Sequence, residues 1–441
     1  MSEAPANAGG VVWLDVSDLL DYIDGNSSVS GIQRVVTALI PELPVIDAAS
    51  ARSENAAAPR FALCKFDFRR QLFLNVEPGD FDAKLRAFRV GGAPRSWNPL
   101  ATLARRRAAK AGGEHVAVSA IPCAFQAADV LVCLGVFWFR PMFAHALVAT
   151  ARARGLKLLM SVHDLIPLRF PEWVNKEVAS IWLSAFDTAM RGADSLLFFS
   201  RHARDDAAAW CADNGVAMPP SRVVRLGDAI NPVVAREPVG EHRVRSHGNY
   251  VLSVAGITAR KNVDLLVKVW ELLSSRHGDL IPPLTIVGKS GDGGEEILRR
   301  VKRANSRRKL ITVLGNVKDA ELAEYYRGAL FTMMPSRMEG WGLPVAESLS
   351  FGRFCLASNA GSIPEVGGDL VAYFDPGDVE GCAALVEKYA FDAEERARAE
   401  ARIAAEYRPT PWSSTAAELV AECGRLLSPG ADGRGRAGGT D

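Results

Sequence analysis

Short apolar runs recur along the chain, and most of them are followed by a polar loop and then by a segment with helical spacing. Runs of this length without polar alternation are typical of parallel strands that are buried on both faces. Strands that alternate with helices predict an α/β fold with a parallel sheet. In the first half of the chain such runs occupy residues 11–16, 61–64, 128–135, 156–162 and 195–200.

The same alternation restarts in the second half, with apolar runs at residues 249–255, 284–288, 310–317, 329–334 and 353–358. Between the two series, residues 231–241 are rich in proline and charge and lack periodicity, which is typical of a linker. We therefore expect two α/β domains, 1–238 and 239–408. A ligand would lie between them, because pockets favour domain interfaces.

The last part of the chain predicts helices and then a tail. Residues 380–406 are rich in alanine and charge, which favours one long helix. Two prolines end this segment, and residues 412–427 resume with amphipathic spacing. Residues 429–441 are too rich in glycine and polar side chains to fold, so we expect a disordered tail.

Composition limits the classes of function. The 441 residues carry a formal net charge of +1, which gives no signal for nucleic acid as a partner. No apolar window is long enough to span a membrane, and the N-terminus lacks the features of a secretory signal. The seven cysteines are scattered and none forms a C-x-x-C pair. They predict buried free thiols in a reducing compartment, and hence a cytoplasmic protein.

Candidate chemistry is concentrated in the loop that follows the apolar run 329–334. Glu339 and Glu347 frame a segment that contains Gly340 and Gly342. Glycines let backbone approach a ligand, and the N–H groups at a helix start attract anions. Carboxylates accept hydrogen bonds from vicinal hydroxyls. The pattern predicts a site for a phosphorylated, hydroxyl-rich ligand; the alternative is a plain strand-to-helix connection in which Glu347 complements the helix dipole.

A second candidate loop, 256–262, joins a strand to a helical segment and contains Arg260 and Lys261. Cationic side chains beside a helix N-terminus favour an anion site, although surface charge near a cleft is the alternative. The glycines after residue 287 do not form G-x-G-x-x-G, and acidic residues follow them. A nicotinamide dinucleotide site is therefore not expected.

Two further candidates lie in the first half. A serine-rich loop leads to Gly31 and a helical segment, which is either a ligand loop or a simple capped helix. His163 ends the apolar run 156–162, and ligand groups lie just beyond the carboxyl ends of strands in open α/β sheets. The alternative is a packed histidine bonded to backbone.

These motifs together resemble the retaining nucleotide-sugar glycosyltransferases of family 4. The resemblance is carried by Glu-Gly-Trp-Gly-Leu-Pro-Val-Ala-Glu at 339–347, by its continuation at 358–369, and by Arg-Lys-Asn at 260–262. His-Asp-Leu-Ile-Pro at 163–167 and Ser-Gly-Ile-Gln-Arg at 30–34 add to it. The resemblance implies the GT-B fold, in which two Rossmann-like domains face one another across a cleft. It also implies that the last helix, within 409–428, crosses back to the N-terminal domain.

The resemblance further implies a role for each candidate. Glu339 contacts the hydroxyls of the donor sugar, Glu347 holds the ribose, and His163 lies near the reacting carbon. Lys261 binds the diphosphate with Arg260 beside it, although many members carry a further arginine where Gly256 stands. Gly31 of the N-terminal loop is expected to contact the donor as well, and so is the backbone at Val317 beside the nucleotide base. The remaining expected donor contacts lie in the turn itself: Ser336, Gly340, Trp341, Gly342 and Leu343.

The implied activity is transfer of a hexose, with mannose favoured, from a nucleotide-diphosphate sugar such as GDP-mannose to a lipid-linked glycan in bacterial surface polysaccharide synthesis. Cationic side chains neutralise the leaving diphosphate, so neither a metal nor another cofactor is expected. The alternatives are a rhamnosyl or other deoxysugar transferase, a GT-B epimerase or phosphorylase, and a non-catalytic nucleotide-sugar scaffold.

Two charged segments need separate interpretation. The basic run at 105–110 is either a solvated surface or a patch that rests on anionic lipid at the cytoplasmic face of the inner membrane. Asp80 and Asp82 form a D-x-D pair, which is a metal signature in another glycosyltransferase fold. Helix capping explains this pair better, because a metal needs further oxygen ligands.

Overall fold

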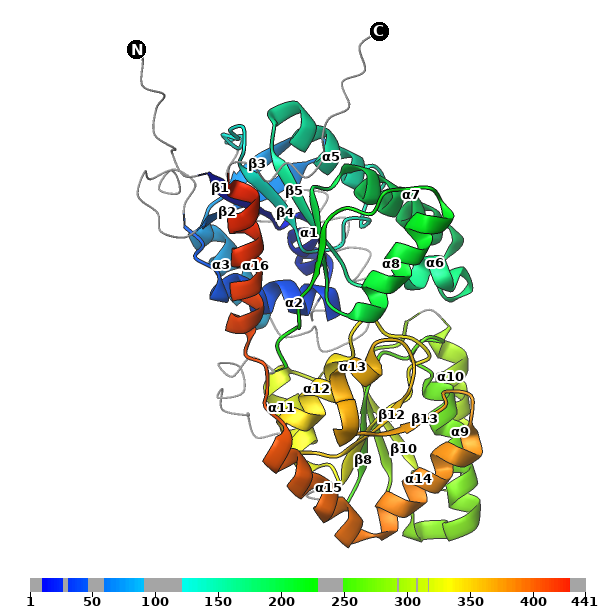
Figure 1. Cartoon of the computed structure of the whole chain (residues 1–441). Helices are drawn as coiled ribbons and strands as arrows, with labels where there is room; N and C mark the ends of the chain where they lie inside the picture. Colours follow the sequence, from blue (N-terminus) through cyan, green and yellow to red (C-terminus); the bar gives the residue numbers. More distant parts are fainter. Residues whose placement is uncertain are drawn as a thin grey trace, which may run out of the picture.

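The computed structural model describes residues 10–26, 31–46, 59–90, 121–228, 249–291, 293–306, 308–315 and 317–428. These residues form two α/β domains stacked one above the other, each with a central sheet and helices packed around it (Figure 1). The predicted α/β class and the division into two sheets are confirmed.

The N-terminal sheet has seven strands in the order β3-β2-β1-β4-β5-β6-β7. All neighbours are parallel except β2 and β3, which form an antiparallel pair at the edge. The central strands are buried on both faces, as their continuous apolar runs predict. The strands are β1 Val11–Asp15, β2 Arg60–Asp67, β3 Leu72–Val76, β4 Val130–Cys133, β5 Lys157–Val162, β6 Ser195–Phe198 and β7 Ser221–Val223.

The helices of this domain cover the sheet and begin close after its strands. Ser200 caps the last of them, as predicted, by accepting a hydrogen bond from the Ala203 N–H. Asp80 and Asp82 lie inside the first two turns of a helix, past the cap position, where Asp80 complements the helix dipole rather than capping the helix. The helices are α1 Ser17–Gly25, α2 Gly31–Leu39, α3 Pro78–Val90, α5 Phe143–Arg154, α6 Ile166–Arg169, α7 Lys176–Gly192 and α8 Arg201–Asp213.

The C-terminal sheet has six parallel strands in the order β10-β9-β8-β11-β12-β13, which is the Rossmann order. The strand order reverses between β8 and β11, so their following loops open a crevice at the carboxyl edge of the sheet. The strands are β8 Val251–Val254, β9 Leu284–Val287, β10 Ile311–Leu314, β11 Phe331–Met334, β12 Cys355–Ser358 and β13 Ala372–Phe374.

The helices of the second domain correct one prediction. Residues 380–406 are not one helix, because Asp392 accepts a hydrogen bond from the Glu395 N–H and so caps a new helix there. The helices are α9 Val263–His277, α10 Gly294–Ala304, α11 Asp319–Gly328, α12 Leu343–Ser350, α13 Ile363–Gly367, α14 Val379–Phe391 and α15 Ala393–Glu406.

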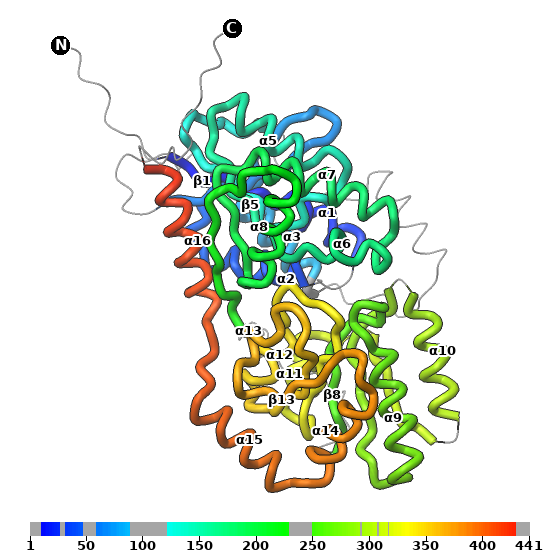
Figure 2. The backbone as a smooth tube through the Cα atoms, turned by 45° about the vertical axis from the view of Figure 1, so that its right-hand side comes forward, coloured from blue at the N-terminus to red at the C-terminus, as the bar shows by residue number. Residues whose placement is uncertain are grey.

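The last helix, α16 Trp412–Leu427, leaves the C-terminal domain and packs on the N-terminal one, as the resemblance implies (Figures 1 and 2). It contacts α2, β4 and β5. Glu422 accepts a hydrogen bond from Ser195 on β6 at 2.6 Å, and the Trp412 ring lies against Gly227. This helix therefore joins the two domains a second time.

Several predictions fall outside the described residues: the domain boundary at 238/239 with its linker, the basic run 105–110, and the tail 429–441. All seven cysteines are described; they are free thiols, and all but Cys123 are buried. Among the residues that the structure describes, no helix combines the length and apolar character needed to cross a membrane.

Candidate active site

The cationic loop and the glutamate turn meet at the reversal point of the C-terminal sheet. The cationic loop, residues 256–262, follows β8, and the glutamate turn, which contains Glu339, follows the neighbouring strand β11. Glu339 accepts hydrogen bonds from Lys261 Nζ at 2.5 Å and from Arg260 at 2.8 Å. The Arg260 guanidinium also donates to the Met338 carbonyl at 3.1 Å. One carboxylate thus holds two cations side by side in the crevice.

The charge state of this cluster follows from its surroundings. Burial disfavours the ionised form of Glu339, but the charges of Arg260 and Lys261 outweigh burial and lower the pKa of Glu339 to about 2. Burial also lowers the pKa of Lys261, although Glu339 opposes this shift. Glu339 is therefore a carboxylate at any working pH, and it keeps its two partners oriented.

Buried polar side chains hold both loops in place. Asn262 adopts the left-handed conformation with φ 54°, which asparagine tolerates, and donates to the Pro335 and Pro376 carbonyls at 3.0 and 2.8 Å. Ser362 donates to the Glu339 and Trp341 carbonyls at 2.9 and 2.8 Å. The carbonyl of the predicted contact Ser336 accepts from the Ser358 hydroxyl. The turn is thus preorganised by β12 and the segment after it.

His163 follows β5 of the N-terminal domain, and its backbone carbonyl lies against this turn. The distance between its Nε2 and the Leu134 carbonyl oxygen is 2.9 Å. A carbonyl only accepts, so Nε2 carries the proton and Nδ1 is left as an acceptor. Burial lowers the pKa of His163 to about 4, which keeps the ring neutral at pH 7. A Cβ added to Gly340 would lie 2.1 Å from the His163 carbonyl oxygen, so the two domains touch here.

Glu347 lies in the second turn of α12 and is almost fully buried. Its Oε1 accepts from Arg34 of α2 at 2.7 Å, and its Oε2 accepts from the Tyr326 hydroxyl at 2.7 Å. Arg34 also contacts Asp319 at 2.5 Å. Burial raises the pKa of Glu347, and the charge of Arg34 opposes this shift. The ion pair crosses from one domain to the other.

The remaining predicted donor contacts occupy the same face of the C-terminal domain. Trp341 is buried, and its ring lies 5.3 Å from the Arg225 guanidinium of the N-terminal domain. Gly342 has φ 122°, which favours glycine, and precedes Leu343, the first residue of α12. Val317 is half-buried after β10.

Gly31 opens α2 on the opposite domain, one turn before Arg34. It is exposed, and no described residue lies within 4 Å of a Cβ built on it. Ser30, the expected cap, lies outside the described residues.

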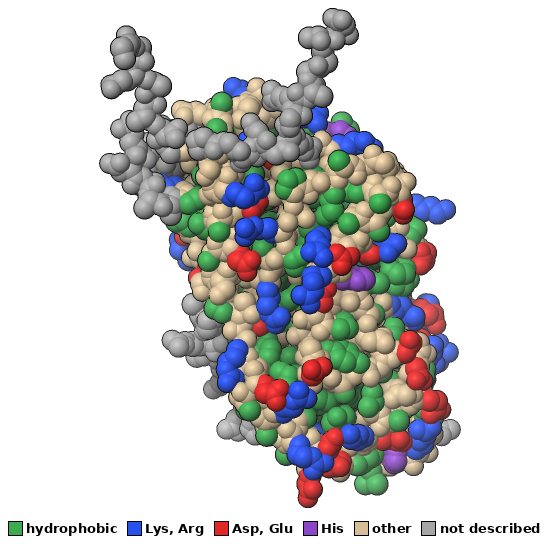
Figure 3. Space-filling view, in the orientation of Figure 1, with side chains coloured by type: hydrophobic (Ala, Val, Ile, Leu, Met, Phe, Trp, Pro, Cys, Tyr) green, Lys and Arg blue, Asp and Glu red, His purple; other side chains and the backbone are tan. Residues whose placement is uncertain are grey.

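A further contact between the domains involves Glu365 of α13. Its carboxylate accepts from the Arg201 and His202 backbone N–H groups at 2.9 and 2.7 Å, so it caps α8 from the other domain. Charged side chains of both signs lie together where the two domains meet on this face (Figure 3). The domains are therefore joined by polar contacts around the candidate site.

Sequence reasoning gave no role to Arg34, Ser362 or Glu365. Each one lies within a motif that resembles the glycosyltransferases, at 30–34 or 358–369. Their positions within these motifs could have singled them out as candidate functional residues. Their roles depend on contacts across the cleft or beneath the turn, which a single sequence does not reveal.

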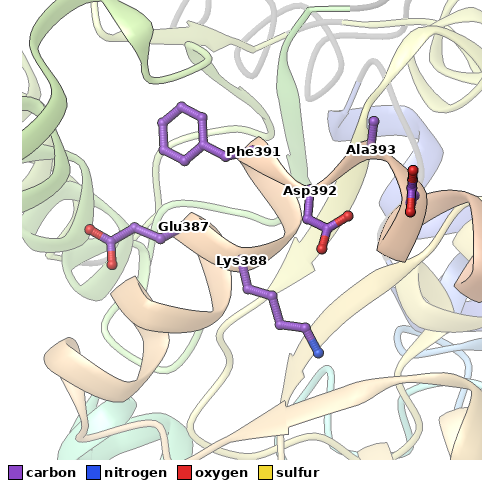
Figure 4. Close-up of a pocket in the computed structure, with 6 residues that line it drawn as sticks. Glu387, Lys388, Phe391, Asp392 and Ala393 are labelled. Atoms are coloured by element: carbon purple, nitrogen blue, oxygen red, sulfur yellow. The ribbon is translucent and has the colours of Figure 1, made fainter.

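A hollow on the outer side of the C-terminal domain, at the bend between α14 and α15, contains none of the candidate residues. Glu387 and Lys388 point in different directions in Figure 4, and so do Phe391 and Asp392. Glu387 is paired with His277 at 2.7 Å, and Lys388 with Glu395 at 2.6 Å. Polar groups do not converge there, so this hollow does not compete with the interdomain site.

Two facing Rossmann-like domains, a crossover helix and a site between them define the GT-B class of fold. The structure of Anabaena Alr3699/HepE in complex with UDP and glucose has this arrangement. It is 14% identical, with a TM-score of 0.59, and the match covers 94% of this chain and 99% of that one.

The sequence comparison agrees: residues 236–405 match the family described as Glycosyl transferases group 1. The chain is 26% identical over 285 residues to the Escherichia coli serotype-specific mannosyltransferase WbdA, covering 62% of this chain and 34% of that protein. It is 30% identical over 171 residues to the E. coli O-antigen chain mannosyltransferase B, covering 39% and 44%. The chain thus spans less than half the length of each of these two relatives.

Proposed function

We propose that the protein transfers a hexosyl group from a nucleotide-diphosphate sugar to a glycan acceptor, with retention of anomeric configuration. One observation carries the proposal: Arg260 and Lys261 are gathered on Glu339, and the next residue, Gly340, lies against the His163 backbone of the opposite domain. Two cations on one carboxylate at the contact between the domains match the needs of a leaving diphosphate and a hydroxyl-rich sugar.

The chemistry follows from where charge develops. Breaking the bond between the anomeric carbon and the phosphate oxygen leaves negative charge on the diphosphate. Arg260, Lys261 and the N–H groups at the start of α12 would stabilise that charge, which is commonly the largest catalytic effect. These side chains supply the charge stabilisation that a metal gives in other transferases, so we propose that no metal is needed.

The two glutamates would have separate tasks. Glu339 would accept hydrogen bonds from the sugar hydroxyls, and Glu347 would accept them from the ribose. His163 presents Nδ1 as an acceptor for a sugar hydroxyl or a phosphate proton. We assign Glu339 an orienting role rather than that of a covalent nucleophile, and we propose that the acceptor attacks from the face that the phosphate leaves. The departing phosphate would take its proton.

Mannose as the sugar and GDP-mannose as the donor are favoured because the two E. coli relatives are named as mannosyltransferases. The acceptor would be a lipid-linked glycan of a surface polysaccharide, such as an O-antigen chain. The basic run 105–110 would then rest on the cytoplasmic face of the inner membrane. The chain's limited coverage of both relatives makes these assignments part of the proposal.

The experiment is a thermal-shift panel of nucleoside diphosphates and their sugars. A ligand present at about 100 times its Kd stabilises the folded chain by about 2.7 kcal/mol. GDP and GDP-mannose should raise the unfolding midpoint more than the UDP and dTDP series. Equal shifts for all three bases would remove the support for GDP, and no shift with any nucleotide would contradict the proposed function.

A further inference from the structure

Two side chains from different elements hold the carboxylate of Glu347. The Tyr326 hydroxyl of α11 donates to Oε2 at 2.7 Å, and Arg34 of α2 donates to Oε1 at 2.7 Å. Figures 1 and 2 show α2 above α11 and α12, where the two domains meet. Each oxygen of this carboxylate therefore accepts one hydrogen bond from a set direction.

These two contacts limit the acceptor positions that remain on Glu347. An ionised carboxylate has about four positions for hydrogen bonds, two on each oxygen. Among the described residues, Tyr326 and Arg34 are the side chains that donate to it, and each uses one position on a different oxygen. One position on each oxygen is left for a ligand. Two positions side by side suit a pair of neighbouring hydroxyl groups better than a single one.

The hydroxyl of Tyr326 is fixed by the packing of its ring. The side chain is fully buried, and the ring is stacked on Phe351 with 5.3 Å between centroids and 7° between planes. The Phe351 N–H in turn donates to the Glu347 carbonyl at 3.1 Å. Burial raises the pKa of Tyr326, and the charge of Glu347 adds to this shift, so the hydroxyl keeps its proton and stays a donor.

The guanidinium of Arg34 is held from two sides. One amino group donates to Glu347, and the other donates to Asp319, the first residue of α11, at 2.5 Å. Asp319 and Tyr326 lie on the same helix, so α11 sets the direction from which both donors reach Glu347. The carboxylate is thus oriented before a ligand arrives, which lowers the cost of ordering it on binding.

We infer that Tyr326, together with Arg34, is a positioning residue that aims Glu347 at the 2′- and 3′-hydroxyls of a ribose. A ribonucleoside diphosphate would fill both remaining acceptor positions, whereas a 2′-deoxyribonucleotide such as dTDP would fill one. The inference rests on the proposed transferase function, in which Glu347 holds the ribose. It assigns the donor to the class of ribonucleoside-diphosphate sugars, and it gives two residues a role that neither the family match nor the named relatives assign.

The test compares GDP with 2′-deoxy-GDP, and UDP with 2′-deoxy-UDP, by calorimetric titration of the full chain. Within the pair that binds more tightly, the unmodified chain should prefer the ribonucleotide about tenfold, the loss expected for one hydrogen bond to a charged group. Tyr326→Phe should reduce this preference to about threefold or less, because the carboxylate is then free to turn. With the matching nucleotide sugar it should raise KM and leave kcat nearly unchanged, since the diphosphate separates the ribose from the reacting carbon.

Tyr250→Phe is the matched control. Tyr250 is buried in the same small core as Tyr326, but its hydroxyl donates to the Tyr325 carbonyl at 2.7 Å rather than to Glu347. This variant also loses one phenol hydroxyl from that core, and it should keep the tenfold preference. Arg34→Lys is a second test variant in case Tyr326→Phe does not fold. It keeps a positive charge but not the planar fork that sets the direction, so it should lower the preference as well.

The outcomes separate the positioning role from the proposed function. Equal binding of ribonucleotides and deoxyribonucleotides by the unmodified chain would overturn the positioning role and leave the transferase proposal standing. An unchanged preference in the test variants that fold, or an equal fall in Tyr250→Phe, would overturn it too. A chain that binds none of the four nucleotides would contradict the proposed function, and this inference with it.

Discussion

Arg34 of the N-terminal domain and Glu347 of the C-terminal domain form an ion pair of 2.7 Å across the cleft. Glu347 is the residue proposed to hold the ribose of the donor. In the free chain its carboxylate is therefore occupied by an arginine from the opposite domain. A ribose that binds Glu347 would share a carboxylate that already accepts from Arg34 and Tyr326, so we expect donor binding and the contact between the domains to be linked.

The first prediction concerns the stability of this pair. Arg34→Met should destabilise the folded chain by about 2 kcal/mol, because it leaves the buried Glu347 carboxylate without its cation. Glu347→Gln in the same chain should recover part of this loss. The unfolding free energies of the two single variants and the double variant measure the coupling. Arg327→Met, which removes an exposed pair with Glu324, is the control. If the double variant lost as much unfolding free energy as the two single variants together, the proposed importance of the pair would be contradicted.

The second prediction concerns Glu339. Glu339→Gln should lower kcat by a factor on the order of 10²–10³, since the sugar loses a charged acceptor and both cations lose their anchor. Affinity for the nucleoside diphosphate should stay close to that of the unmodified chain, because Arg260 and Lys261 remain. Steady-state kinetics and calorimetric titration check the two halves separately. A glycosyl adduct on Glu339, detected by mass spectrometry, would show instead that this residue is a nucleophile.

The third prediction concerns stability at acid pH. The pKa of Glu339 is about 2 in the folded chain, below the ordinary value of 4.5. A carboxyl group with a lowered folded pKa contributes stability above its unfolded pKa and loses it as the pH falls through the folded value. The difference in unfolding free energy between the unmodified chain and Glu339→Gln should therefore be constant above about pH 5 and shrink from there towards pH 2. A difference that stays constant down to pH 3 would contradict the assigned pKa.

The fourth prediction concerns His163. Its pKa is about 4 in the folded chain against 6.5 ordinarily, so the unfolded chain binds the extra proton first. This histidine should therefore lower stability as the pH falls from 6.5 towards 4. Nitrogen NMR of the imidazole should show the neutral ring at pH 7 with the proton on Nε2. Titration of this ring near pH 6.5, or a proton on Nδ1, would contradict the geometry at Leu134.

The fifth prediction tests contact between the domains. Gly340→Ala would place a Cβ 2.1 Å from the His163 carbonyl oxygen, so the turn must move away from β5. We expect a larger radius of gyration in X-ray scattering and a lower kcat. Gly315→Ala is the control in the same domain, because no described residue lies within 4 Å of its added Cβ. An unchanged kcat in Gly340→Ala would show that this close approach is not needed.

Much of this fold could be predicted from the sequence because buried parallel strands form continuous apolar runs. The loop residues Arg260, Lys261 and Glu339 were found because they follow two such strands. The break at Asp392 was missed because helix propensity is high on both sides of it, although an aspartate followed three residues later by a glutamate is a local signal for a helix start. Helix α7 was missed as well, although Asn175 caps it by accepting from the Glu177 N–H.

Contacts between the domains were beyond sequence reasoning. The pair between Arg34 and Glu347 joins residues more than 300 positions apart, and the Glu365 cap on α8 spans more than 160 positions. No local sequence pattern encodes a contact between residues that are so far apart along the chain. The family motifs contained these residues, but their partners became visible only when the two sheets were placed face to face.

The most direct test of the central claim is the release of nucleoside diphosphate from nucleotide sugars by the unmodified chain and by Lys261→Met. The claim is that the cations on Glu339 stabilise a leaving diphosphate. It predicts that the unmodified chain releases GDP from GDP-mannose and that Lys261→Met is slower by a factor on the order of 10². Release by Lys261→Met at the rate of the unmodified chain, or no release from any nucleotide sugar, would contradict it.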